Sequence, residues 1–106
     1  MTPDFYYKLE SAICNAKNAA REYENIEDGG TCNFDSPIIH LEKADKKQLA
    51  MMDFEVSPIG GRGWKDWYFV NIPLSGQGAR RTKMAEAAAE SLKADGYDAM
   101  VYYQMD

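Results

Sequence analysis

The sequence predicts a single α+β domain, and three observations lead to that prediction. The chain has 106 residues, a length that suits one domain with a hydrophobic core of its own. Its 45% hydrophobic and 27% charged residues lie near the average of globular proteins and differ from the composition of disordered chains. Three segments have the pattern of helices, and four short segments have the apolar content of strands. We therefore expect residues 1–106 to fold as one unit.

The first predicted element is a helix from Pro3 to about Asn25. Residues 2–4 supply a capping hydroxyl, a proline at the first helical position and an acidic side chain, which together favour a helix start. Apolar residues then recur at alternating steps of four and three, and they are Phe5, Leu9, Ala12, Ala16, Ala19, Tyr23 and Ile26. The pair Gly29-Gly30 follows this N-terminal helical unit, residues 1–27, and begins a loop.

Two strands separated by a short helix are predicted next. The segment from Ile38 to Leu41 is mostly apolar on both faces, as expected of an interior strand. Residues 42–52 are rich in good helix formers. Residues 53–57 alternate between polar and apolar side chains, which is typical of a half-buried strand.

The rest of the chain adds a hairpin partner, a helix and a last strand. Residues 58–63 form a glycine-rich turn into a strand at 67–72. Residues 79–94 form a helix that Asp95-Gly96 closes, and its expected buried face contains Met84, Ala87, Ala88, Ser91 and Leu92. Residues 97–105 are apolar on both alternating faces and form the last strand.

The order of the last six elements is the split βαβ arrangement, βαββαβ, of ferredoxin-like folds. We therefore predict a ferredoxin-like core in residues 37–106 with an added N-terminal helix. Because both faces of the last strand are largely apolar, neither face of the sheet can be fully open to water. We expect the N-terminal helix to cover the second face, and the alternative is that a homo-oligomer buries this face between subunits.

Composition limits the classes of function. Seventeen acidic and twelve basic residues give a net charge of −5, which opposes non-specific binding to nucleic acid and favours a protein partner with a basic surface. Two cysteines and one histidine match neither a disulfide framework nor a zinc site, so we expect no metal. We find no signal peptide and no apolar run of roughly 20 residues, so we expect a soluble cytoplasmic protein without a membrane partner.

The stretch SGQGARRTK, residues 75–83, places three cations in the first turn of a predicted helix. Cations at this end oppose the helix dipole, at a cost of a few tenths to about 1 kcal/mol each, so helix stability does not explain them. A functional explanation is that glycine N–H groups and arginine side chains bind an anion or a partner. The predicted site contains Gly76, Gln77, Gly78, Arg80, Arg81 and Lys83.

An alternative interpretation of this stretch is purely structural. The glycines would then only form a turn, and the two arginines would pair with acids such as Glu24, Glu27 and Asp28. The stretch also lacks the full pattern of a P-loop or of a dinucleotide fingerprint. We therefore predict no nucleotide cofactor.

Two further features are treated as accessory to this site. A thiol at Cys32 near His40 would meet the minimum for nucleophilic catalysis, but the spacing does not require contact, and Asn33 and Asp35 are ordinary turn formers. We therefore predict no catalytic residue. Trp64 is expected to be the exposed aromatic residue of the hairpin tip, where tryptophan can anchor a protein partner.

The segment from Arg62 to Val70 combines aromatic and basic residues, as RNA-binding sheets do. Domains of that kind stack bases on aromatic residues of two central strands, but the segment from Ile38 to Leu41 has no Phe, Tyr or Trp. Trp67 and Phe69 are therefore expected in the core, and the sequence argues against nucleic acid as a partner.

The stretches GTCNFDSP, GQGARRTKMAEA and GYDAMVYYQMD resemble a group of small uncharacterised proteins of bacterial phages and integrative mobile elements. The resemblance spans most of the chain after Gly29 and implies a context, since small acidic proteins of phages often resemble inhibitors of host defence in size and charge, which is an analogy of class only. We therefore expect a non-catalytic interaction module that binds a host or mobile-element protein through the turn from Gly76 to Lys83. The alternative is a binder of phosphate or nucleotide that uses Gly76, Gly78, Arg80 and Arg81, with hydrolytic chemistry from the Cys32 loop.

Overall fold

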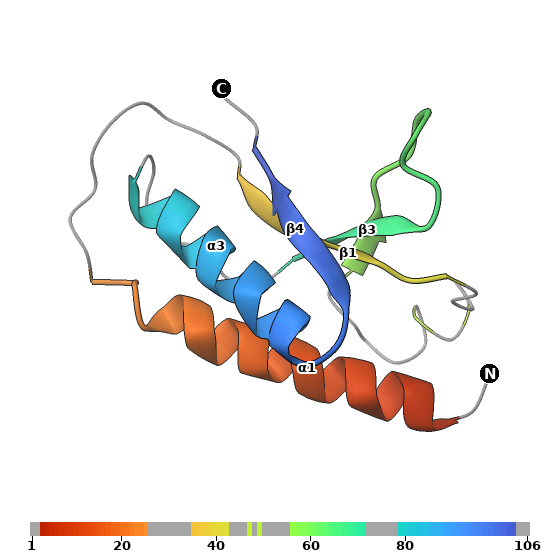
Figure 1. The fold of residues 1–106 in the computed structure, drawn as a ribbon, viewed down its shortest axis with the longest axis horizontal. Helices are drawn as coiled ribbons and strands as arrows, with labels where there is room; N and C mark the ends of the chain where they lie inside the picture. Colours follow the sequence, from red (N-terminus) through yellow and green to blue (C-terminus); the bar gives the residue numbers. More distant parts are fainter. Residues whose placement is uncertain are drawn as a thin grey trace.

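The computed structural model describes residues 3–25, 35–42, 47, 49, 56–71 and 79–103. Its elements are α1 (Pro3–Arg21), β1 (Ser36–His40), β2 (Val56–Pro58), β3 (Trp67–Val70), α3 (Ala79–Ala94) and β4 (Asp98–Tyr102). The strands form one sheet in the order β2-β3-β1-β4, and each neighbouring pair is antiparallel (Figure 1). The predicted α+β class is confirmed.

The helix predicted for residues 42–52 lies largely outside the described residues. Lys47 and Leu49 are described, and both are helical. Leu49 is buried in the same core cluster as the helices α1 and α3. This part of the chain therefore contributes at least one side chain to the core.

Helix α1 ends at Arg21, before the predicted end at Asn25. The next residues continue as tight turns, in which the N–H groups of Glu22, Tyr23 and Glu24 each donate to the carbonyl three residues earlier. Bonds of this type tighten the last turn of a helix and satisfy carbonyl groups that have no partner within it. The described length of α1 is therefore one turn shorter than predicted.

The buried face of α1 is only partly the predicted one. Leu9, Ala12 and Ala16 are buried as expected. Tyr23, which the prediction placed on this face, is 38% exposed. The residues missed by the prediction are Tyr6, Ile13 and Ala20. Each of these three residues directly follows a predicted member of the apolar stripe. The buried face of α1 is therefore wider than the predicted stripe and is rotated from it around the helix axis.

Helix α3 begins and ends at the predicted residues. At its C-terminus Gly96 has a φ of +94°, its N–H donates to the carbonyl of Lys93 at 2.9 Å, and the N–H of Tyr97 donates to that of Leu92 at 3.1 Å. This is the Schellman motif, in which glycine takes the left-handed conformation at no steric cost. Small side chains line the buried face, whose members are Met84, Ala85, Ala88, Ala89 and Leu92.

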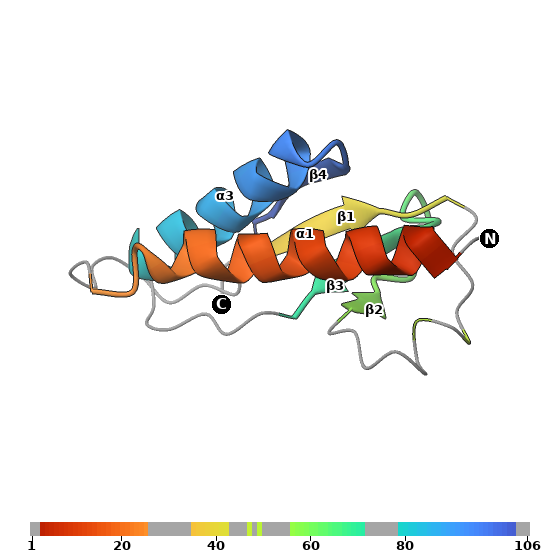
Figure 2. The ribbon, with the colours of Figure 1, turned by 90° about the horizontal axis from the view of Figure 1, so that it is seen from below.

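Helices α1 and α3 run side by side (Figures 1 and 2). Their buried residues share one core cluster with Ile39, Tyr68, Val70 and Ala99, which come from three strands. Both helices therefore pack on the same face of the sheet. The expectation that the N-terminal helix covers the second face is wrong, because alanine-rich faces let α1 and α3 pack closely against one another instead.

Candidate functional site

The strand register defines the sheet face that points away from the helices. Ile38 of β1 lies opposite Phe69 and Met100, and His40 lies opposite Trp67 and Asp98. Successive side chains of a strand alternate between faces, so these residues share one face with Tyr102. We call this surface, together with Trp64 of the β2–β3 turn, the aromatic face. The same register adds Ser36, opposite Tyr102, and Ser57, opposite Phe69. The members of the aromatic face are therefore Ser36, Ile38, His40, Ser57, Trp64, Trp67, Phe69, Asp98, Met100 and Tyr102.

Five rings form a continuous chain across the aromatic face. The ring centroids of His40 and Trp67 are 5.2 Å apart, and those of Trp67 and Trp64 are 6.1 Å apart. Trp64 in turn lies 5.4 Å from Tyr102, which lies 5.5 Å from Phe69. Tilted and edge-to-face contacts of this kind are the favoured geometries of aromatic pairs.

The indole of Trp64 lies over the central strand β1. Its ring contacts Trp67 of β3 and Tyr102 of β4, and β1 lies between these two strands in the sheet. Ile38 of β1, on the same face, is 0% exposed. The rings therefore form a small second apolar layer on the sheet face opposite α1 and α3.

This layer corrects three predictions. Trp64 was expected at an exposed hairpin tip, but it is half-buried against two other rings. Trp67 and Phe69 were expected in the main core, but Tyr68 and Val70 take that place. Strand β3 is apolar on both faces. The alternation of its side chains therefore does not reveal whether Trp67 and Phe69 or Tyr68 and Val70 point toward the helices.

The turn that carries Trp64 is held by backbone hydrogen bonds. Asp66 has a φ of +66°, and its carbonyl accepts a 2.8 Å hydrogen bond from the N–H of Leu41. The N–H of Trp67 donates to the carbonyl of Trp64 at 3.1 Å. A left-handed Asp66 therefore lets the chain close this turn and keeps the indole of Trp64 above the sheet.

The aromatic face is partly exposed and carries little charge. Met100 is 43% exposed, and the five rings are half-buried. Asp98 is the one carboxylate among these described members, and none of them is a lysine or an arginine. Large aromatic side chains and methionine with few charges are typical of the centre of a protein interface.

Two residues in the first turn of α3, Arg81 and Thr82, contact Asp35, the residue before β1. The Arg81 Nε–H donates to the main-chain carbonyl of Asp35 at 3.0 Å, and the Thr82 hydroxyl donates to the Asp35 carboxylate at 2.7 Å. Asp35 is only 5% exposed. Helix α3 has no acidic residue in its own first turn, so Asp35 supplies a negative group there from elsewhere in the chain.

The predicted anion site is described only in part. Gly76, Gln77 and Gly78 lie outside the described residues, as do Cys32 and Asn33 of the accessory loop. Within the described part, Arg80 and Arg81 are half-buried and Lys83 is exposed. The structure brings Arg81 together with Asp35, whereas Trp64 belongs to the aromatic face. The anion site itself stays a prediction.

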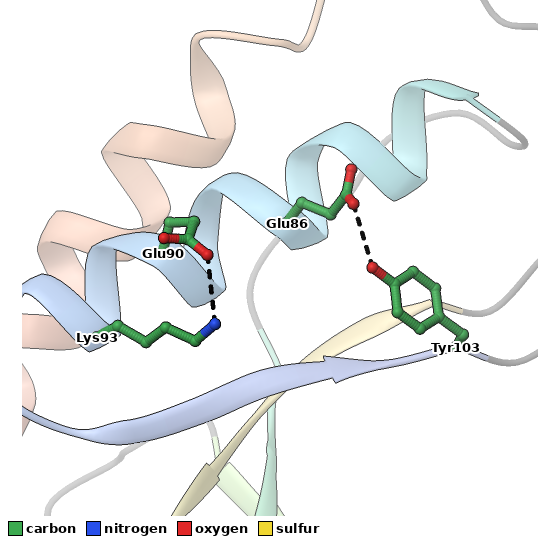
Figure 3. Close-up of polar contacts among 4 residues, drawn as sticks. All are labelled: Glu86, Glu90, Lys93 and Tyr103. Carbon is green, nitrogen blue, oxygen red and sulfur yellow. Dashed lines mark hydrogen bonds and ion pairs between the residues drawn. The ribbon is translucent and has the colours of Figure 1, made fainter.

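A groove of about 350 Å³ lies between α1 and α3. Its lining residues are Ala19, Glu22, Tyr23, Lys83, Glu86, Ala87 and Glu90. Glu86 accepts a 3.1 Å hydrogen bond from the Tyr103 hydroxyl, and Glu90 lies 3.3 Å from the ammonium group of Lys93 (Figure 3). Two of its carboxylates are thus already in contact with other side chains of the molecule.

The described ranges contain no cluster of metal-binding side chains and no helix that could span a membrane. In these ranges no three side chains of His, Cys, Asp and Glu gather in a way that would hold a metal ion. Neither α1 nor α3, the two helices described in full, combines the length and the apolar character that crossing a bilayer requires. Cys14 on α1 is an exposed free thiol.

The chain matches no protein-family model, no curated protein and no solved structure.

Proposed function

We propose that this chain is a non-catalytic protein-interaction module and that the aromatic face is its docking surface. The observation that carries the proposal is the chain of five rings beside the 43% exposed side chain of Met100. Tryptophan and tyrosine supply much of the binding energy of protein interfaces, because they bury a large area at little entropic cost. The partner would present an apolar surface of its own.

We further propose that the sheet belongs to a ferredoxin-like core. Counted from the other edge, the strand order is β4-β1-β3-β2, with a β2–β3 hairpin and an antiparallel register throughout. This order is the one expected when two split βαβ units interleave. In such a core both crossover helices lie on one face, so the opposite face is available for contact.

The cellular context is also part of the proposal. The resemblance to proteins of phages and mobile elements suggests a host or mobile-element protein as the partner, in the cytoplasm. The turn from Gly76 to Lys83 would be a second contact, through Lys83, which is exposed. A phosphate ligand is less favoured than a protein, because the carboxylate of Asp35 lies at the first turn of α3 and would repel an anion there.

Two matched variants test the docking surface. Met100→Lys places a charge on the aromatic face, whereas Tyr7→Lys places the same charge at a 67% exposed position of α1. Proteins of the source cells would be captured on the immobilised parent and on both variants, after circular dichroism has shown that all three are folded. We expect a partner retained by the parent and by Tyr7→Lys but lost with Met100→Lys. Equal retention by Met100→Lys would contradict the proposal.

A further inference from the structure

We draw no further inference here: the strongest candidate, the groove between α1 and α3 lined by Glu22, Glu86 and Glu90, is a cluster of acidic side chains that also contains Lys83, and nothing in the structure shows what ligand it would take.

Discussion

The Thr82 hydroxyl donates a 2.7 Å hydrogen bond to the carboxylate of Asp35, which ties the first turn of α3 to the residue that precedes β1. Beside it, the guanidinium of Arg81 binds the main-chain carbonyl of the same aspartate. Part of the positive charge at the start of α3 therefore has a structural partner within the fold. The stability of this junction can be measured separately from any binding.

Removing the Asp35 carboxylate should destabilise the protein. For Asp35→Ala we expect the free energy of unfolding to fall by about 2 kcal/mol, because a buried hydrogen bond and a favourable charge at the helix start are lost. Thr82→Val should cost about 1 kcal/mol, and the double variant should show a coupling energy of about 1 kcal/mol in urea unfolding. Ser57→Ala is the control, because its hydrogen bond to Asn71 is exposed. Strict additivity of Asp35→Ala and Thr82→Val would contradict the coupling.

Reversing the charge of Arg81 should act on stability rather than only on binding. Arg81→Glu removes the donor to the Asp35 carbonyl and adds a second carboxylate nearby, so we expect a loss of about 2 kcal/mol in the free energy of unfolding. Lys83→Glu, at an exposed position of the same helix, should change it by less than about 0.5 kcal/mol. The measurement is urea unfolding of both variants, and an equal effect of the two would contradict a structural role of Arg81.

The same variants test the predicted anion site. If that site binds phosphate, inorganic phosphate at a hundredfold excess over its dissociation constant would stabilise the parent by about 2.7 kcal/mol. Thermal unfolding with phosphate, against sulfate-free buffer of equal ionic strength, measures this effect. If phosphate raises the unfolding midpoint of the parent but not that of Lys83→Glu, the result supports the site. If phosphate leaves the midpoint of the parent unchanged, phosphate is excluded as the ligand.

The left-handed conformation of Asp66 should determine which residues this turn accepts. Aspartate tolerates a positive φ better than most residues, whereas a β-branched side chain is strained there. We expect Asp66→Gly to change the free energy of unfolding by less than about 1 kcal/mol and Asp66→Val to lower it by about 2 kcal/mol. Thermal unfolding compares the two variants. The prediction fails if Asp66→Val is as stable as Asp66→Gly.

Alkaline pH should destabilise the fold through Tyr68. Burial, followed by the charge of Asp66 and by Tyr6, raises the pKa of Tyr68 above its ordinary value of 10.0. As the pH rises, the unfolded state therefore releases this proton before the folded state does. The contribution of Tyr68 to the free energy of unfolding is fully present below pH 10 and is lost as the pH rises through the higher pKa of the folded state. Tyr68→Phe should flatten this decline in urea unfolding from about pH 8 to about pH 11. Tyr7→Phe, at an exposed position, is the control, and an unchanged slope for Tyr68→Phe would contradict the prediction.

The sequence predicted local structure better than it predicted which surfaces meet. The bounds of α3 are correct, because a run of helix formers ends at Asp95-Gly96, where glycine can take the left-handed conformation. The hairpin of β2 and β3 is also confirmed, since glycines mark its turn. Such features depend on residues close together in the chain, and their patterns are therefore visible in the sequence.

The candidate site depended on contacts between distant segments. Nothing in the local pattern links Asp35 to Thr82, because this contact exists only once β1 lies beside α3. The aromatic face was missed for a related reason, since β3 is apolar on both sides and its orientation is set by the packing of α1 and α3. The sequence indicated no aromatic contact for His40, whose ring on β1 makes a tilted contact with Trp67.

The position of Trp64 over β1 also has a kinetic consequence. Its indole reaches its contact with Tyr102 only after the C-terminal strand has joined the sheet. Tryptophan emission, which combines Trp64 and Trp67, should therefore include a change that accompanies the pairing of β4 with β1, a contact between segments far apart in the chain that carries a large loop-closure cost. In a stopped-flow refolding experiment it would time the completion of the sheet.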